Sequence, residues 1–266
     1  MDVIKDKPTT FSKGDPANQP IIFIHGFPFD HNMWNNQVNE LSPNYFCISY
    51  DIRGLGESPA GDGQYTMEMF AEDVLGIIER EKLYKPVLCG LSMGGYIAQR
   101  VVEKYVNLFS SLILCDTKSA ADDNDAKIKR AEGIKKINES GVEKFVEGFI
   151  SNCFAEESKS KPIYKETLNR SLSFSPAGVK GCLLAMVGRT DTTEFLSLIK
   201  SSVLLICGEK DKLTPPFIME QMAESIADSE LHIIPGAGHI TPLEKPEMFN
   251  KILTDFLSRR VLKDKK

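Results

Sequence analysis

Gly90-Leu91-Ser92-Met93-Gly94-Gly95 is the most informative stretch of this 266-residue sequence. It follows the short apolar run Val87-Leu88-Cys89 and precedes a helix-like segment, Tyr96 to Lys104. A serine at so sharp a strand-to-helix turn adopts a strained backbone and needs small neighbours, which glycine provides. The stretch therefore predicts that Ser92 is a nucleophile exposed at the end of a strand, and the alternative is a plain glycine-rich turn.

Further apolar runs bounded by turn residues predict the rest of a sheet. Their hydrophobicity is continuous rather than alternating, which is typical of parallel strands covered on both faces. Helical patterns lie between them, and one is capped by Thr66, while Thr214 and Pro215 predict another helix start. The order indicates an α/β fold with a doubly wound, mostly parallel sheet. The predicted strands are Ile21 to Ile24, Tyr45 to Tyr50, Val87 to Cys89, Leu112 to Cys115, Val203 to Cys207 and Leu231 to Ile234.

One long interval interrupts this alternation. Between Cys115 and Val203 the sequence has helical patterns, such as Asp125 to Glu139 and Val142 to Cys153, and no clear strand. A single crossover needs only about a dozen residues, so the excess predicts a helical insertion at the carboxyl ends of the strands. We expect an α/β core from residues 1–116 and 201–266, with residues 117–200 as a helical cap.

A serine nucleophile needs a base, and the chain has four histidines. His239 follows the last predicted strand on a glycine loop that can bring the imidazole to the serine. The other three have different expected roles. His232 is expected to pack within a strand, His25 to support a loop at a strand end, and His31 to lie beside Asp30 in an entrance loop.

The base in turn needs a carboxylate that holds its tautomer. Asp211, in Gly208-Glu209-Lys210-Asp211, follows the strand Val203 to Cys207 and gives the order Ser92, Asp211, His239. Asp116, directly after the strand Leu112 to Cys115, is the alternative acid. It occupies the same edge of the sheet and could instead brace the junction with the insertion.

Two backbone N–H groups are needed to stabilise the oxyanion of an acyl transfer. One is expected from Met93, which follows the nucleophile. The other is expected from the loop His25-Gly26-Phe27-Pro28, where proline has no N–H and the candidate is therefore Phe27.

These segments together resemble the α/β-hydrolases of the esterase and 3-oxoadipate enol-lactonase group, which includes cofactor-free perhydrolases. The resemblance runs from about residue 20 to 257 and also includes Trp34 and the segment Asp51-Ile52-Arg53-Gly54-Leu55-Gly56-Glu57-Ser58. It implies that the cap follows the family's sixth-strand position, that Asp51 and Arg53 are structural, and that no metal or organic cofactor is required. Related dehalogenases and epoxide hydrolases have a nucleophilic aspartate where this chain has Ser92.

Charge and composition limit the other possibilities. The net charge of −5 and pI near 5.5 do not favour nucleic-acid binding, and the basic end, Arg259 to Lys266, is expected to be a solvated tail. The first residues have no signal-peptide core and no apolar run is long enough to span a membrane, so we expect a cytoplasmic protein. The six cysteines include no Cys-x-x-Cys pair and are expected to be buried thiols rather than metal ligands.

The sequence thus predicts a serine hydrolase that cleaves a small ester or lactone through an acyl-enzyme. An alternative from another class is a hydrolase-like sensor that binds a small ligand and signals through a protein partner. Perhydrolysis at the same site, suggested by Pro28 beside the expected oxyanion donor, is a third hypothesis. Nothing in the sequence indicates an oligomeric state.

Overall fold

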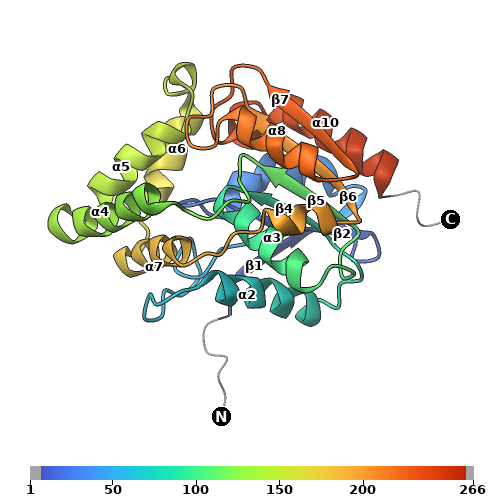
Figure 1. Cartoon of the computed structure of the whole chain (residues 1–266), viewed down its shortest axis with the longest axis horizontal. Helices are drawn as coiled ribbons and strands as arrows, with labels where there is room; N and C mark the ends of the chain where they lie inside the picture. Colours follow the sequence, from blue (N-terminus) through green and yellow to red (C-terminus); the bar gives the residue numbers. More distant parts are fainter. Residues whose placement is uncertain (1–6, 262–266) are drawn as a thin grey trace, which may run out of the picture.

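A seven-stranded sheet with helices on both faces forms the centre of the computed structural model, which describes residues 7–261 (Figure 1). The strand order is β1-β3-β2-β4-β5-β6-β7, and every neighbouring pair is parallel except β1 with β3. The doubly wound, mostly parallel sheet predicted from the sequence is confirmed. The strands are β1 Thr10–Lys13, β2 Gln19–Ile24, β3 Tyr45–Tyr50, β4 Val87–Leu91, β5 Ser111–Cys115, β6 Ser202–Gly208 and β7 Ser229–Ile234.

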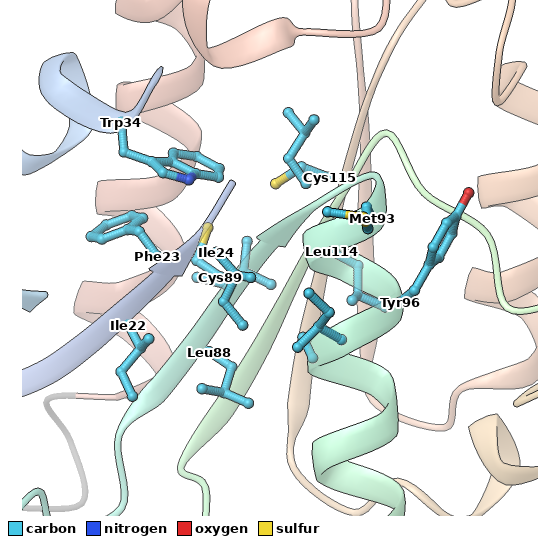
Figure 2. Close-up of a cluster of buried hydrophobic side chains, with 14 of the residues drawn as sticks. Ile22, Phe23, Ile24, Trp34, Leu88, Cys89, Met93, Tyr96, Leu114 and Cys115 are labelled. Carbon is cyan, nitrogen blue, oxygen red and sulfur yellow. The ribbon is translucent and has the colours of Figure 1, made fainter. Parts of the chain in front are cut away.

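The central strands are buried on both faces, as their continuous hydrophobicity predicted. Every residue of β4 and β5 is buried, and Ile22, Leu88 and Leu114 are fully inaccessible to solvent. Figure 2 shows this layer, with Phe23 of β2 beside Trp34 and with Met93 at the start of the helix that follows β4. The core therefore fixes the ends of β4 and β6, and Ser92 and Asp211 of the candidate site follow these two strands.

The two edge strands differ from what the sequence predicted. β1 was not predicted, because its four residues are half-buried or exposed and lack an apolar run. β7 was predicted to be covered on both faces, yet most of its residues are only half-buried and Ile233 is 40 % exposed. An edge strand has a neighbour on one side only, which accounts for this exposure.

Two helix pairs cover opposite sides of the sheet (Figure 1). Thr66 caps α2 by accepting a hydrogen bond from the Met69 amide at 3.2 Å, and the apolar face of this helix is buried as predicted. Thr214 does not cap a helix, because α8 begins at Pro216 and the Thr214 hydroxyl donates a hydrogen bond to Asp211 instead. The core helices are α1 Asn35–Leu41 and α10 Pro246–Arg260 on one side, α2 Met67–Arg80 and α3 Met93–Lys104 on the other, with α8 Pro216–Ser225, α9 Thr241–Glu244 and the 3-10 helix η1 His31–Trp34.

Between β5 and β6 the chain forms helices and no strand, and these helices project beyond one end of the sheet (Figure 1). The predicted helix Val142 to Cys153 has the same bounds as α5, and α4 extends the other predicted helix by one residue at each end. The insertion follows the fifth strand of this sheet. Its helices are α4 Asn124–Ser140, α5 Val142–Cys153, η2 Glu156–Ser158, α6 Pro162–Ser171, α7 Pro176–Val187 and η3 Glu194–Leu198.

The C-terminal basic residues were predicted to be a solvated tail, and this is wrong for the first two of them. Arg259 and Arg260 belong to α10, and both pair with Glu230 of β7. The remaining basic residues, Lys263, Lys265 and Lys266, lie outside the described range, as does the start of the chain from Met1 to Asp6. Of the helices within residues 7–261, none is long and apolar enough to cross a membrane.

Candidate active site

Ser92 lies at the turn between β4 and α3 with φ 53° and ψ −114°. Non-glycine residues rarely adopt a positive φ, and this conformation turns the chain sharply so that the side chain projects from the strand end. The turn needs glycine on both sides of the serine. A Cβ on Gly90 would lie 2.3 Å from the Gly94 carbonyl oxygen, and one on Gly94 would lie 2.2 Å from that of Ile24.

A continuous hydrogen-bonded chain runs from Ser92 through His239 to Asp211. The Oγ of Ser92 lies 2.8 Å from Nε2 of His239, and Nδ1 of His239 lies 2.8 Å from Oδ2 of Asp211. These three residues follow the ends of β4, β6 and β7, which all lie at the carboxyl edge of the sheet, with β5 between β4 and β6. His239 and Asp211 are almost inaccessible to solvent.

The Asp211 carboxylate is held in a fixed orientation by its own loop. Its Oδ1 accepts hydrogen bonds from the Leu213 and Thr214 amides at 2.8 and 3.0 Å, and the Thr214 hydroxyl donates to Oδ2 at 2.6 Å. Burial raises the pKa of Asp211, but the charge of His239 and these hydrogen bonds outweigh that effect, so the pKa is lowered. The carboxylate is thus stabilised in its charged form beside the imidazole.

Asp116, the alternative acid, is also fully buried but has different partners. Its Oδ1 accepts a hydrogen bond from the Gly208 amide at 2.8 Å, and its Oδ2 accepts one from the Thr241 hydroxyl at 2.6 Å. Burial and the nearby charge of Asp211 raise the pKa of Asp116 well above its ordinary value. Asp116 therefore connects β5 to β6 and to α9, and it does not hydrogen-bond to His239.

Phe27 and Met93 have the positions expected of oxyanion donors. Met93 is the first residue of α3, so its amide has no intrahelical acceptor. Phe27 is buried just beyond β2, the strand next to β4. Within residues 7–261, neither amide donates a hydrogen bond to another residue.

A cavity of about 390 Å³ opens above Ser92 and His239. Phe27 forms part of its wall, and its ring packs edge-on against Phe149 of α5 at 5.2 Å. The insertion therefore contributes much of the wall of the cavity, and the core contributes Ser92 and His239 at its bottom. The lining residues are Phe27, Ser92, Tyr96, Lys118, Asp122, Ala126, Lys129, Arg130, Phe145, Phe149, Asn152, Leu183, Met186, Leu213, Thr214 and His239.

The fold and this serine-centred geometry agree with a comparison of the sequence against known families. Residues 21–252 match the family described as the alpha/beta hydrolase family. The chain belongs to this family. The match covers both parts of the core and the whole helical insertion, so alpha/beta hydrolase describes nearly the entire chain.

Individual alpha/beta hydrolases are similar over almost their whole length. The 3-oxoadipate enol-lactonase 2 of Acinetobacter baylyi is 27 % identical over 258 residues, which are 94 % of this chain and 92 % of that protein. A thermophilic esterase from Thermogutta terrifontis, solved with malate bound, is 34 % identical with a TM-score of 0.90, covering 95 % and 93 %. An esterase from Exiguobacterium antarcticum is 27 % identical with a TM-score of 0.84, covering 94 % and 96 %.

Two residues of this alpha/beta hydrolase site were missed by the sequence analysis. Thr214 was assigned to a helix start, but its hydroxyl contacts Asp211 and lies 3.2 Å from Nδ1 of His239. Glu244 is a buried carboxylate that accepts hydrogen bonds from the Gly238 amide at 2.7 Å and the Ala155 amide at 3.0 Å. The spacing of Thr214 from Asp211 was a usable signal. The contact of Glu244 with Ala155 spans 89 residues and left no signal in the sequence.

Glu244 takes part in a connection between the histidine loop and the insertion. The His239 amide donates to the carbonyl of Cys153 at 2.8 Å, at the end of α5. A Cβ on Gly238 would lie 2.6 Å from the Ala155 nitrogen, so only glycine fits between the two segments. The backbone of His239 is therefore positioned by the insertion as well as by the core.

The remaining histidines lie away from the cavity. His25 is fully buried, donates from Nδ1 to the Gly26 carbonyl and accepts at Nε2 from the Ile52 amide at 2.9 Å, and burial lowers its pKa. His31 was expected in an entrance loop but stacks on Phe11 and pairs with Asp51 at 2.9 Å. His232 is half-buried in β7.

The other polar and thiol groups singled out from the sequence have structural partners. Asp51 accepts a hydrogen bond from the Glu57 amide and Arg53 pairs with Asp73, so both order the loop after β3. All six cysteines are buried and free. In the described part of the chain, no group of three or more His, Cys, Asp or Glu side chains is placed to hold a metal ion.

A buried ion cluster forms one wall of the cavity. Asp122 is inaccessible to solvent and pairs with Lys118 at 3.0 Å, Arg130 at 2.9 Å and Arg189 at 3.3 Å. Arg189 also donates to the carbonyls of Ser119 and Ala120, so the cluster connects the beginning of the insertion to its end. Burial opposes ionisation, but the three cations lower the pKa of Asp122 to about 2.

This lowered pKa predicts a pH-dependent contribution to stability. A group with a folded-state pKa below its unfolded value stabilises the protein above the unfolded pKa and loses that effect as pH falls through the folded pKa. Asp122 should contribute about 2 kcal/mol at pH 6 and roughly half of that at pH 3. Urea unfolding of the wild type and of Asp122→Asn should be measured at both pH values. The difference between their free energies of unfolding should be smaller at pH 3 than at pH 6 by about 1 kcal/mol. A difference that is the same at both pH values would contradict the assigned pKa.

Proposed function

We propose that this chain hydrolyses small carboxylic esters or lactones through an acyl-enzyme formed on Ser92, without a metal or organic cofactor. The observation that carries the proposal is the hydrogen-bonded chain from Ser92 through His239 to Asp211 at the base of the cavity. The lactonase and esterases to which the chain is similar act, by their names, on the same class of bond.

In the first half of the reaction, the Oγ of Ser92 attacks the carbonyl carbon while its proton passes to Nε2 of His239. Asp211 holds Nδ1–H of the imidazole and stabilises the imidazolium that forms. The Phe27 and Met93 amides donate to the oxyanion of the tetrahedral intermediate. When the intermediate collapses, the C–O bond to the alcohol breaks, and His239 returns the proton to the departing oxygen.

In the second half, a water molecule takes the place of the alcohol. His239 removes its proton, the water oxygen attacks the acyl carbon, and a second tetrahedral intermediate forms on the same two amides. Its collapse releases the carboxylic acid and reprotonates Ser92. For a lactone, alcohol and acid remain joined, so the product is a hydroxy acid.

Steady-state turnover of a panel of p-nitrophenyl esters and simple lactones tests this function. A hydrolase should release many equivalents of product per chain, because deacylation uses the same base and oxyanion donors as acylation. Release of a single equivalent, followed by a stable acyl-enzyme, would instead support the ligand-sensing alternative. Absence of both acylation and turnover across the panel would contradict the proposal.

We also propose that residues 117–200 act as a cap over a core of residues 1–116 and 201–266. The cavity walls contributed by the insertion include Phe145, Phe149, Leu183 and Met186, which are apolar. The proposed nucleophile, base, acid and oxyanion donors all lie outside it. Such a cap would select the acyl group and would not supply reacting groups.

Phe149→Ala should therefore change the selectivity between acyl chains more than it changes the turnover of the acetate ester. Removing the ring that packs against Phe27 enlarges the cavity, so kcat/KM for p-nitrophenyl hexanoate relative to the acetate should change by roughly 10-fold, mainly through KM. Leu184→Ala is the matched control, because Leu184 is 47 % exposed and does not line the cavity. Loss of acetate turnover in folded Phe149→Ala would show that the insertion contributes to catalysis.

A further inference from the structure

The cavity above Ser92 has one charged wall, which the reaction described above does not use. Lys118, Lys129 and Arg130 line it together with a single carboxylate, that of Asp122. The rest of the lining consists mainly of aromatic and aliphatic side chains. An excess of positive charge therefore faces the space in which a substrate would lie.

Arg130 is held in a fixed position with part of its guanidinium unused. Its Nε donates to Oδ2 of Asp122 at 2.9 Å, and Asp122 is itself fixed by Lys118 and Arg189. Among residues 7–261, the two terminal nitrogens of Arg130 have no hydrogen-bond acceptor. The side chain is 18 % exposed, so these nitrogens are only partly accessible to water. A planar guanidinium with free terminal N–H groups is suited to binding a carboxylate.

Lys129 adds a second cation to this wall, and unlike Arg130 it has no counter-ion among the described residues. It lines the cavity, and no Asp or Glu of the described residues lies within ion-pair distance of its Nζ. Three cations and one carboxylate line this wall, and Arg189 behind it adds a fourth cation. Because Asp122 balances only one of these charges, the wall favours an anion over a neutral group of the same size.

We propose that the substrate is an ester or lactone that carries a second, free carboxylate, and that Arg130 and Lys129 bind that carboxylate. The proposal rests on the proposed function, since it concerns the substrate class of the same site. The ester lies over Ser92, its carbon chain lies against the apolar wall, and the remote carboxylate reaches α4. The free carboxylate belongs either to the acyl part or to the alcohol part of the substrate.

Paired substrates test this preference. In the first pair, monoethyl glutarate carries its charge on the acyl side and ethyl pentanoate is the neutral counterpart. In the second pair, 4-acetoxybutanoate carries its charge on the alcohol side and butyl acetate is the neutral counterpart. Hydrolysis of all four esters is followed by pH-stat. Wild type should favour the anionic member of at least one pair by 10-fold or more in kcat/KM, because hydrogen bonds to charged groups are worth one to two powers of ten. A preference for the neutral member in both pairs would overturn the proposal.

Variants identify the residues that carry the preference. Lys129→Met should lower the anionic-to-neutral ratio of kcat/KM by roughly 10-fold, and it should fold normally because Lys129 pairs with no described residue. Arg130→Met should lower it by up to about 100-fold. Arg130→Lys, which keeps the charge beside Asp122, checks that the loss is not due to misfolding and should retain part of the preference. Lys135→Met on the same helix is the control, since that side chain is 74 % exposed.

A binding measurement separates this proposal from the proposed function. Calorimetric titration of Ser92→Ala with monoethyl glutarate should detect binding that Arg130→Met weakens by 10-fold or more, whether or not the wild type turns the ester over. Binding without turnover would contradict the hydrolase function and support the carboxylate site. Turnover of neutral esters, with no binding of either anionic ester, would support the hydrolase and overturn the carboxylate site.

Discussion

Ser92→Ala should lower kcat for p-nitrophenyl acetate by roughly six orders of magnitude, to the rate given by the oxyanion donors and the cavity alone. In the proposed mechanism the Ser92 hydroxyl forms the acyl bond, and no other hydroxyl lies within hydrogen-bonding distance of Nε2 of His239 among residues 7–261. Alanine fits the turn because it removes an atom and adds none. The loss should therefore appear in kcat without a matching loss of stability.

A fluorophosphonate probe provides the second measurement for this prediction. It should label wild type at Ser92 alone, as located by peptide mass spectrometry, and should not label Ser92→Ala. Ser225→Ala is a suitable control, because Ser225 is exposed and donates only to a carbonyl of its own helix. Labelling of any of the six buried cysteines, or hydrolysis that persists in Ser92→Ala, would refute the assigned nucleophile.

Asp211→Asn should lower kcat by about four orders of magnitude, as loss of the orienting carboxylate does in a serine protease. The asparagine amide no longer fixes the required tautomer of His239 or stabilises the imidazolium. Its NH₂ group also faces the donors that now point at Asp211, which should cost about 1–3 kcal/mol of stability. Activity should therefore be measured on protein shown to be folded by circular dichroism at the assay temperature.

Asp116→Asn is the matched comparison, because it removes a second buried carboxylate at the same edge of the sheet. Asp116 hydrogen-bonds to Gly208 and Thr241 rather than to His239, so the loss in kcat should stay within about tenfold while unfolding shifts to lower urea. If Asp116→Asn lost more activity than Asp211→Asn, the acid would have to be reassigned to β5.

Local sequence was enough to predict the central elements and their order. Each of the inner strands is a continuous apolar run, and burial on both faces leaves little choice of conformation for such a run. The tight turn at Ser92 was equally clear, because glycine at positions 90 and 94 is required by contacts within a few residues of the turn or with the adjacent strand. The edge strand β1 left no comparable signal, since it is held by pairing with β3 rather than by its own hydrophobicity.

The choice between Asp211 and Asp116 depended on tertiary structure. Both residues follow strands at one edge, and the sequence favoured Asp211 only through the order of residues and its glycine-bearing loop. The loop from Gly208 to Thr214 turns the Asp211 carboxylate toward His239, whereas the backbone at Asp116, with φ 44°, directs its carboxylate to Thr241. Side-chain direction at a strand end depends on such loop geometry, which short-range patterns do not encode.

The same holds for the walls of the cavity. The sequence by itself determined that the chain between Cys115 and Val203 forms helices and no strand, because helix periodicity and capping are local properties. It did not show that Lys118, Asp122, Arg130 and Arg189 form one cluster, since Arg189 is separated from Asp122 by 67 residues. Their meeting depends on how α4 packs against α7, since Arg189 follows the end of α7. Tertiary packing therefore decided which charges line the cavity above Ser92, while the sequence determined the fold that places Ser92 at its strand end.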